Sequence, residues 1–312
     1  SDSIGFCFSY PMVILPSLDG RLIRFCKEIR APEVEGELIG QGLKRALQDR
    51  GHKNIRKIVL LNDTTATLLA GRSMAAGSSR YDSYLGFILG TGMNCCYTES
   101  GIPKLGTSSG REQIVVLESG SYRSKVRGVL DEQFDAKTMD PGYYTFEKMF
   151  SGGYIGGISL LTLQTAAQDG LLGSRASERI CALKELTTRD LDLFLKEPRN
   201  PGHCIGSILQ GEDERTYEVV YRILDSFTER AALFTAATMA AAVLKSGKGS
   251  DPSRPVCITL EGTTFYETKN IKSRTEYYLK AFLENQQGRY TEISRVEHAS
   301  LKGAAIAALM EG

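Results

Sequence analysis

The sequence has no excess of charge of either sign. Its 312 residues include 38 Lys and Arg against 37 Asp and Glu, a formal net charge of +1 at pH 7. A chain that binds nucleic acid or an anionic membrane surface usually concentrates basic residues. We therefore expect no nucleic acid and no membrane among its partners. The length allows one large domain or two ordinary ones, each with a hydrophobic core.

Long apolar runs and secretion signals are also missing. The longest weakly polar stretch, Ala231 to Leu244, is too short to span a bilayer and has charged neighbours at Arg230 and Lys245. No N-terminal segment joins a basic end to an apolar core, as a secretory signal would. These absences predict a cytoplasmic protein.

The cysteines lack the spacing of a metal site or a redox motif. Seven are present, an odd number, and none forms a CxxC pair. Cys95 and Cys96 are neighbours on an expected strand and would face opposite sides, which favours reduced packing residues over a disulfide. His203 and Cys204 have no companion pair, so a loop is the better interpretation there. We expect no metal ligands in this chain.

What the sequence does contain is organised around residues 58 to 71. Ile58 to Leu61 is a short apolar run typical of a buried strand, and Thr64 to Gly71 reads as a helix of small residues. Asn62 and Asp63 lie between them, at the carboxyl end of the strand, where open α/β sheets bind ligands and place active-site residues. Asp63 has two interpretations, a functional carboxylate or a helix N-cap.

A second strand-turn-strand unit follows at residues 85 to 97. Two apolar strands flank a corner made of Gly90, Thr91 and Gly92. Such a corner lets the backbone approach an anion and offers it N–H groups and a hydroxyl. The alternative is an ordinary hairpin turn with two permissive glycines.

Further elements complete an α/β pattern with a partly parallel sheet. Helical spacing predicts a helix over Glu33 to Arg50, and residues 183 to 215 contain no clear strand. Apolar runs predict further strands at Ile4–Phe8, Ile114–Leu117 and Val256–Leu260. Ala-rich or periodic stretches predict further helices at Gly157–Ala167 and Thr216–Lys245, and a last one that ends at Met310.

Four motifs, in this order, resemble the hexokinase family of sugar kinases, within the actin-like ATPase superfamily. They are FSYP at residues 8–11, LNDTTAT at 61–67, LGTGMN at 89–94 and FEKM-x-SG at 146–152. The resemblance implies a ribonuclease H-like fold, with a mixed sheet flanked by helices and two lobes around a sugar cleft. It divides the chain into a remainder of the small lobe (1–61), a large lobe (62–298) and a C-terminal helix (299–312).

The resemblance also assigns site residues. Asp63 would be the catalytic base, and sugar hydroxyls would meet Ser9, Lys27, Asn62, Asn94, Glu118 and Glu147. Nucleotide and phosphate would meet Gly90, Thr91, Gly92, Gly262, Thr263 and Ser300. The chain departs from the family pattern where Cys26 replaces Thr, Val116 replaces Asn, Glu261 replaces Asp, and Ala299 and Leu301 replace glycines.

The implied activity is ATP-dependent phosphorylation of a hexose, with glucose expected, at the 6-hydroxyl as the first step of glycolysis. ATP and Mg²⁺ are the implied cofactors, a hexose the implied partner, and a homo-oligomer an open possibility. The family's early phosphate loop, D-x-G-G-T-N-x-R, is not found in the 312 residues. We therefore expect a fragment without the first strands, since a sheet lacking them would expose unpaired edges.

Two other functions stay open at this stage. A non-catalytic sugar-sensing relative, or an inactive fragment, would keep the sugar contacts without turnover. An actin-like ATPase or assembly protein would keep nucleotide loops without FSYP and FEKM. Asp63 with the Gly90–Gly92 corner argues against the sensor, and the presence of both sugar motifs argues against the assembly protein.

Overall fold

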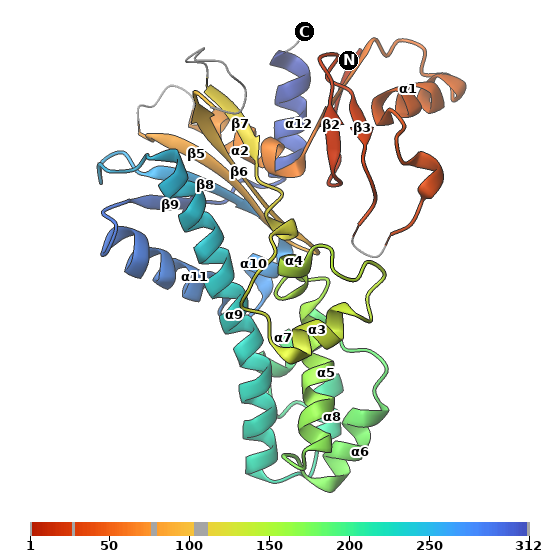
Figure 1. Ribbon diagram of the computed structural model, residues 1–312, viewed down its shortest axis with the longest axis vertical. Coiled ribbons are helices and arrows are strands. Elements are labelled where there is room, and N and C mark those ends of the chain that lie inside the picture. Colours follow the sequence, from red (N-terminus) through yellow and green to blue (C-terminus); the bar gives the residue numbers. More distant parts are fainter. Residues whose placement is uncertain (1, 27–28, 76–79, 103–111, 311–312) are drawn as a thin grey trace.

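The computed structural model describes residues 2–26, 29–75, 80–102 and 112–310 (Figure 1). Its N-terminal part contains two small β units. Strand β1 (Ser3–Cys7) pairs in parallel with β4 (Lys57–Leu61), and β2 (Met12–Ile14) forms an antiparallel hairpin with β3 (Gly20–Leu22). Helix α1 (Ile39–Asp49) lies between β3 and β4 in the chain, as a parallel pair requires a long connection.

A five-stranded mixed sheet forms the centre of the molecule. Its order is β7-β6-β5-β8-β9, in which β6 runs antiparallel to both of its neighbours and the other four strands run in the same direction. The strands are β5 (Ser83–Leu89), β6 (Met93–Ser100), β7 (Glu112–Val116), β8 (Val256–Glu261) and β9 (Thr291–Ser294). The carboxyl ends of β5 and β8 therefore meet at one edge, where a site is expected.

Helices cover both faces of this sheet. Gly86 of β5 faces α2 (Asp63–Met74) so closely that an added Cβ would lie 2.3 Å from the carbonyl oxygen of Thr64. Phe87, the next residue, points to the other face and belongs to the main core with α9 (Glu214–Ser246). Helix α12 (Ala299–Met310) packs on α2, with Gly303 against the backbone of Ala66.

The remaining helices are short and gather largely at the end of the molecule away from β1–β3 (Figure 1). They are α3 (Val129–Asp135), α4 (Thr145–Lys148), α5 (Ile155–Gln168), α6 (Ser174–Ala182), α7 (Thr188–Lys196), α8 (Cys204–Leu209), α10 (Thr263–Glu267) and α11 (Ile271–Leu279). A π turn (Lys280–Glu284) extends α11, and 3₁₀ turns occupy Pro32–Val34 and Ser119–Ser121.

Two sequence predictions were wrong in detail. The helix expected over residues 33–50 begins only at Ile39, because Gly36 has φ +85° and Leu38 is extended. The loop expected at His203 and Cys204 is instead the start of α8, with His203 at the N-cap position. Residues 183–215, which gave no clear pattern, contain α7 as well.

The long helix predicted over residues 216–245 is confirmed as α9. In the described part of the chain, it is the one helix long and apolar enough to cross a membrane, judged by length and composition. Core helices pass the same test, and more than half of its most apolar window is buried. Ala231, Met239 and Val243 are fully buried in the main core, so the packing of α9 accounts for its composition.

Candidate active site

Asn62, and not Asp63, caps helix α2. Its Oδ1 accepts from the N–H of Thr64 at 2.9 Å and from the Thr64 hydroxyl at 2.5 Å. Asp63 is the first helical residue, and its Oδ1 lies 2.9 Å from the same Thr64 nitrogen. No other hydrogen bond to Asp63 is found within the described residues. Because the cap position is already filled, the capping interpretation does not account for Asp63.

Asp63 lines a small cavity with side chains from several distant segments. The cavity measures about 20 Å³, room for about one water molecule. Its walls contain the predicted residues Ser9, Asp63, Asn94, Glu118 and Glu147, joined by Pro11, Cys26, Met93, Gly120 and Tyr144. The fold thus gathers four predicted sugar contacts around the predicted base. Asn62 stands beside them as the cap, and Lys27 lies outside the described residues.

The acidic wall of this cavity is held in place by backbone contacts. Glu147 on α4 is 2% exposed, and its Oε2 accepts from the N–H of Met93 at 2.8 Å. Asn94 donates to Glu118 at 3.2 Å, while its Oδ1 accepts from the N–H groups of Cys95 and Ser119. These bonds fix the side-chain orientations before any ligand binds, as preorganised sites require.

Two lining residues, Cys26 and Tyr144, were not among the predicted contacts. Tyr144 has φ +52°, uncommon for a bulky side chain, and it directly precedes α4 with Glu147. Burial, with Cys26 and Glu118 nearby, raises the pKa of Tyr144 well above its usual value. The one sequence feature that could have indicated Tyr144 as a lining residue was its position three residues before Glu147. Nothing in a single sequence marks a backbone conformation of this kind.

The Gly90–Gly92 corner joins β5 to β6, and its carbonyls are hydrogen-bonded to the turn between α4 and α5 and to helix α10. The Gly90 carbonyl accepts from the N–H of Gly152 at 2.8 Å and from the hydroxyl of Thr264 at 3.0 Å. The Thr91 carbonyl accepts from the N–H of Gly153 at 2.8 Å. Within the described residues the N–H groups of Thr91 and Gly92 have no acceptor. An anion placed at the corner could accept hydrogen bonds from both N–H groups.

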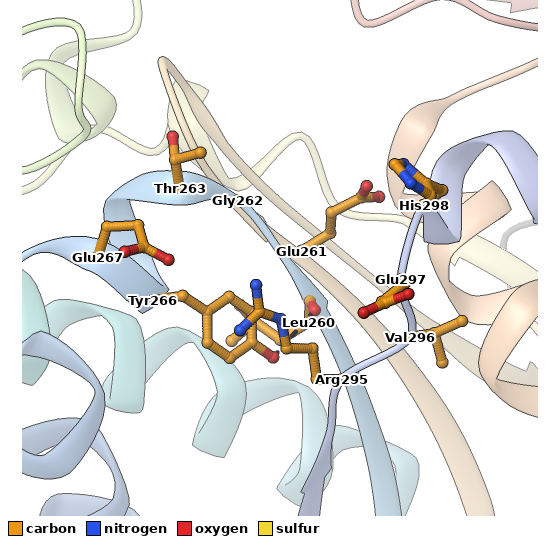
Figure 2. Close-up of a pocket in the computed structure, with 10 residues that line it drawn as sticks. All are labelled: Leu260, Glu261, Gly262, Thr263, Tyr266, Glu267, Arg295, Val296, Glu297 and His298. Carbon is orange, nitrogen blue, oxygen red and sulfur yellow. Dashed lines mark hydrogen bonds between the residues drawn. The ribbon is translucent and has the colours of Figure 1, made fainter.

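A larger pocket of about 450 Å³ lies at the end of β8 (Figure 2). The predicted Gly262 and Thr263 line it, with Gly262 at φ +134° and an added Cβ only 2.1 Å from the Leu89 carbonyl oxygen. The opposite wall is the segment before α12, where the Arg295 guanidinium stacks 4.4 Å from the centre of the Tyr266 ring. Burial raises the pKa of Tyr266 to about 12. Neither residue was predicted from the sequence.

Ser300 is not in the wall of this pocket. Its N–H donates to Glu261 at 2.8 Å, and its hydroxyl makes a short hydrogen bond to the same carboxylate oxygen. Glu261, a pocket residue, also receives a long hydrogen bond from Thr67 of α2. Ser300 therefore acts on the pocket through Glu261 in this arrangement. Nearby, burial with Asp63 and Glu261 raises the pKa of Cys7 to about 12, so this thiol stays protonated.

The cysteines are free and largely structural. Cys95 and Cys96 are both buried in the sheet and unbridged, as expected, and burial raises the pKa of each thiol. No group of three or more His, Cys, Asp or Glu side chains that could hold a metal ion occurs in the described ranges. The chemistry available is thus a half-buried carboxylate, fixed polar acceptors and backbone donors at a glycine corner.

Family models and several known proteins are similar to this chain. Two family models, each described as hexokinase, match residues 2–73 and 84–310. Hexokinase-2 from Homo sapiens is 26% identical over 97% of the chain, which covers 33% of that relative. Hexokinase-1 from Schizosaccharomyces pombe is 28% identical over 99% of the chain, which covers 65% of it. The chain thus spans one third to two thirds of these relatives.

Solved structures show the same fold. A hexokinase from Schistosoma mansoni complexed with glucose superposes with a TM-score of 0.82 at 22% identity, over 99% of this chain and 70% of that one. A ROK family glucokinase from Streptomyces griseus, in complex with glucose and AMPPNP, gives 0.51 at 14% identity, over 94% and 78%. The α/β actin-like ATPase fold is therefore confirmed. With a hexokinase model matching well over half of its length, the chain belongs to the hexokinase family.

Proposed function

We propose that this chain carries the catalytic carboxylate of a kinase that phosphorylates a hexose, glucose being the expected one, at the 6-hydroxyl. The observation that carries the proposal is the convergence of Ser9, Asp63, Asn94, Glu118 and Glu147 on one cavity. Carboxylates and amide oxygens suit a polyol, because each hydroxyl needs an acceptor. The relative from Schistosoma mansoni, which is described as complexed with glucose, supports a hexose over other polyols.

Asp63 is assigned as the general base. The reacting hydroxyl would lose its proton to the Asp63 carboxylate as its oxygen bonds to the transferred phosphorus, and the bond from that phosphorus to the leaving nucleotide oxygen breaks. The neighbouring acceptors would hold the sugar so that one hydroxyl lies beside Asp63. A positioned base contributes about 10²–10⁴-fold to the rate.

The nucleotide is assigned to the Gly90–Gly92 corner and the pocket beyond β8. The N–H groups of Thr91 and Gly92 suit phosphate oxygens, and the Arg295–Tyr266 wall offers a flat surface. Met93, directly after the corner, lines the sugar cavity, so the two sites adjoin. The AMPPNP bound to the Streptomyces griseus relative supports ATP as donor.

Magnesium fits only in part. Mg²⁺ is usually bound by one or two carboxylates together with substrate phosphates. Asp63 is one such carboxylate, and the described residues hold no cluster that could build a metal site alone. We infer that Mg²⁺ arrives with the nucleotide, where it would neutralise phosphate charge. A cytoplasmic, glycolytic role and a homo-oligomer stay predictions.

Replacing Asp63 by the isosteric Asn tests the proposal. A coupled assay follows hexose-dependent ADP formation as a change in absorbance, and calorimetry measures the Kd for glucose. Asp63→Asn should lower kcat by about 10²–10⁴-fold and leave the glucose Kd within about threefold. The exposed Asp169, at the end of α5, provides the control Asp169→Asn, which should match the unmodified chain.

Each possible result has a clear meaning. Equal loss of binding and turnover in Asp63→Asn would contradict the base assignment. Glucose binding without ADP formation in the unmodified chain would favour the sugar-sensing alternative. ADP formation that is independent of hexose would favour an actin-like ATPase.

A further inference from the structure

Arg24 connects the N-terminal β units to the loop between α3 and α4. It follows β3, and its Nη2 lies 3.0 Å from Oδ2 of Asp140 on that loop. Its guanidinium also lies 4.2 Å from the centre of the Tyr143 ring and 5.9 Å from that of Tyr144. The pair is partly shielded, with side-chain exposures of 27% for Arg24 and 33% for Asp140. An ion pair and a cation–π contact therefore bind the same two segments.

The loop that presents Asp140 is itself firmly anchored. Lys148, which is 3% exposed, donates to the Asp140 carbonyl at 2.6 Å, the Thr138 hydroxyl at 2.7 Å and Asp135 at 2.7 Å. Asp135 also accepts from the N–H of Gly142 at 2.9 Å. Asp140 therefore cannot follow Arg24 if the N-terminal units move. The contact between Arg24 and Asp140 would break instead.

Both ends of this contact adjoin the sugar cavity. Cys26, two residues after Arg24, forms part of one wall, and Tyr144, four residues after Asp140, forms part of another. Lys148 is the neighbour of Glu147 on α4. The cavity has room for about one water, so a hexose can enter only when these walls separate. Separation of the walls would pull Arg24 away from Asp140 and Tyr143.

We propose that Arg24, with Asp140 and Tyr143, is a latch that resists separation of the cavity walls and so limits entry of the occupant. The proposal rests on the proposed function for the identity of that occupant, a hexose. Arg24 is a positioning residue, because it lies outside the cavity wall. Its contacts are made when the walls meet and lost when they part, so they stabilise the shut arrangement over the parted one that a hexose can enter.

The latch predicts a specific kinetic signature. Arg24→Gln or Asp140→Asn should lower the hexose KM by up to about tenfold, because the loss of a partly shielded ion pair and a cation–π contact makes the walls easier to separate. The value of kcat should be unchanged, since the reacting groups are intact. The double variant should have the same KM as either single variant. Arg21→Gln is the control, because the side chain of that exposed arginine donates to the Gly36 carbonyl, within the N-terminal part of the chain.

Hydrogen exchange without sugar provides a second readout. Backbone amides of residues 21–26 and 138–144 should exchange faster in Arg24→Gln and Asp140→Asn than in the unmodified chain or Arg21→Gln. Additive KM effects, or unchanged KM and exchange, would overturn the latch. If the unmodified chain shows no hexose-dependent ADP formation, the proposed function fails. The exchange measurement then still decides whether the contact holds the two segments together.

Discussion

Replacing Lys148 by Met gives the sharpest stability prediction. Met has nearly the same length and stays apolar, so the change removes the ammonium without opening a large cavity. Lys148 Nζ donates to three oxygens, on Asp135, Thr138 and Asp140, at 2.6 to 2.7 Å. All three lose a donor in a region from which water is largely excluded. The prediction is a destabilised but folded chain.

The magnitude follows from the groups left behind. Removing one member of a buried ion pair costs about 3–5 kcal/mol, because the remaining charge loses its partner. Asp135 keeps two other donors, Arg127 at 3.0 Å and the N–H of Gly142 at 2.9 Å. These contacts place the expected loss at the lower end, about 3 kcal/mol. The Thr138 hydroxyl can rotate to another acceptor and adds little.

Urea denaturation followed by circular dichroism measures the effect. Lys272→Met is the matched control, since Lys272 forms an exposed i,i+4 pair with Glu276 at 3.8 Å. Loss of that pair should cost no more than about 0.5 kcal/mol. If Lys148→Met lies within about 1 kcal/mol of the unmodified chain, the buried network does not stabilise the fold as argued.

The pH dependence checks the electrostatic part of the argument. Burial raises the pKa of Asp135, but the hydrogen bonds from Lys148 and Gly142 outweigh it and hold the pKa below the ordinary value. A lowered carboxyl pKa stabilises the fold above the unfolded pKa of about 3.9, and that stability is lost as the pH falls through the folded value. The cost of Lys148→Met should therefore be full at pH 7 and shrink below about pH 4. A cost independent of pH would mean that Lys148 acts by packing alone.

Two further substitutions test how the corner and α9 are built. Gly152→Ala would place a Cβ 2.0 Å from Thr264 Oγ1 and 2.6 Å from the Gly90 carbonyl oxygen. We therefore expect the corner to shift and the nucleotide KM to rise about tenfold or more. Gly42→Ala is the control, because an added Cβ there meets nothing within 4 Å, and it should leave the nucleotide KM unchanged. Asp213→Ala removes the N-cap of α9, whose carboxylate accepts from the N–H of Thr216 at 2.8 Å, and should lower the urea midpoint of unfolding. An unchanged midpoint would show that the packing of α9 alone fixes its start.

Several strands were readable from the sequence because they are largely buried on both faces. Residues 58–61 and 256–260 form continuous apolar runs that became β4 and β8, and the two apolar strands expected within residues 85–97 became β5 and β6. The start of α1 was missed because hydrophobic spacing runs through Gly36, whose left-handed φ breaks the helix. Helix α7 carried a readable signal in its capping box, where Thr187 and Asp190 bond reciprocally.

The site was predictable where its residues lie within short motifs. Ser9, Asp63, Asn94 and Glu147 lie in the four motifs, and the fold brings them to one cavity with Glu118, which was assigned from the resemblance outside those motifs. Single side chains outside such motifs were not predictable. Arg295 after β9 and Tyr266 of α10, for example, meet across the second pocket from segments that share no pattern and are close only in three dimensions.

The restraints on the cavity residues differ in a way that matches their proposed roles. Glu147 is fixed by the N–H of Met93, and Asn94 is fixed by those of Cys95 and Ser119. Such groups can orient a substrate without reorganising when it binds. At Asp63 the hydrogen bond found among the described residues, from the N–H of Thr64, reaches Oδ1 and leaves Oδ2 facing no described donor. In the proposed reaction that second oxygen is where the proton of the substrate hydroxyl would arrive, because a general base needs an oxygen that is not already bonded to a donor.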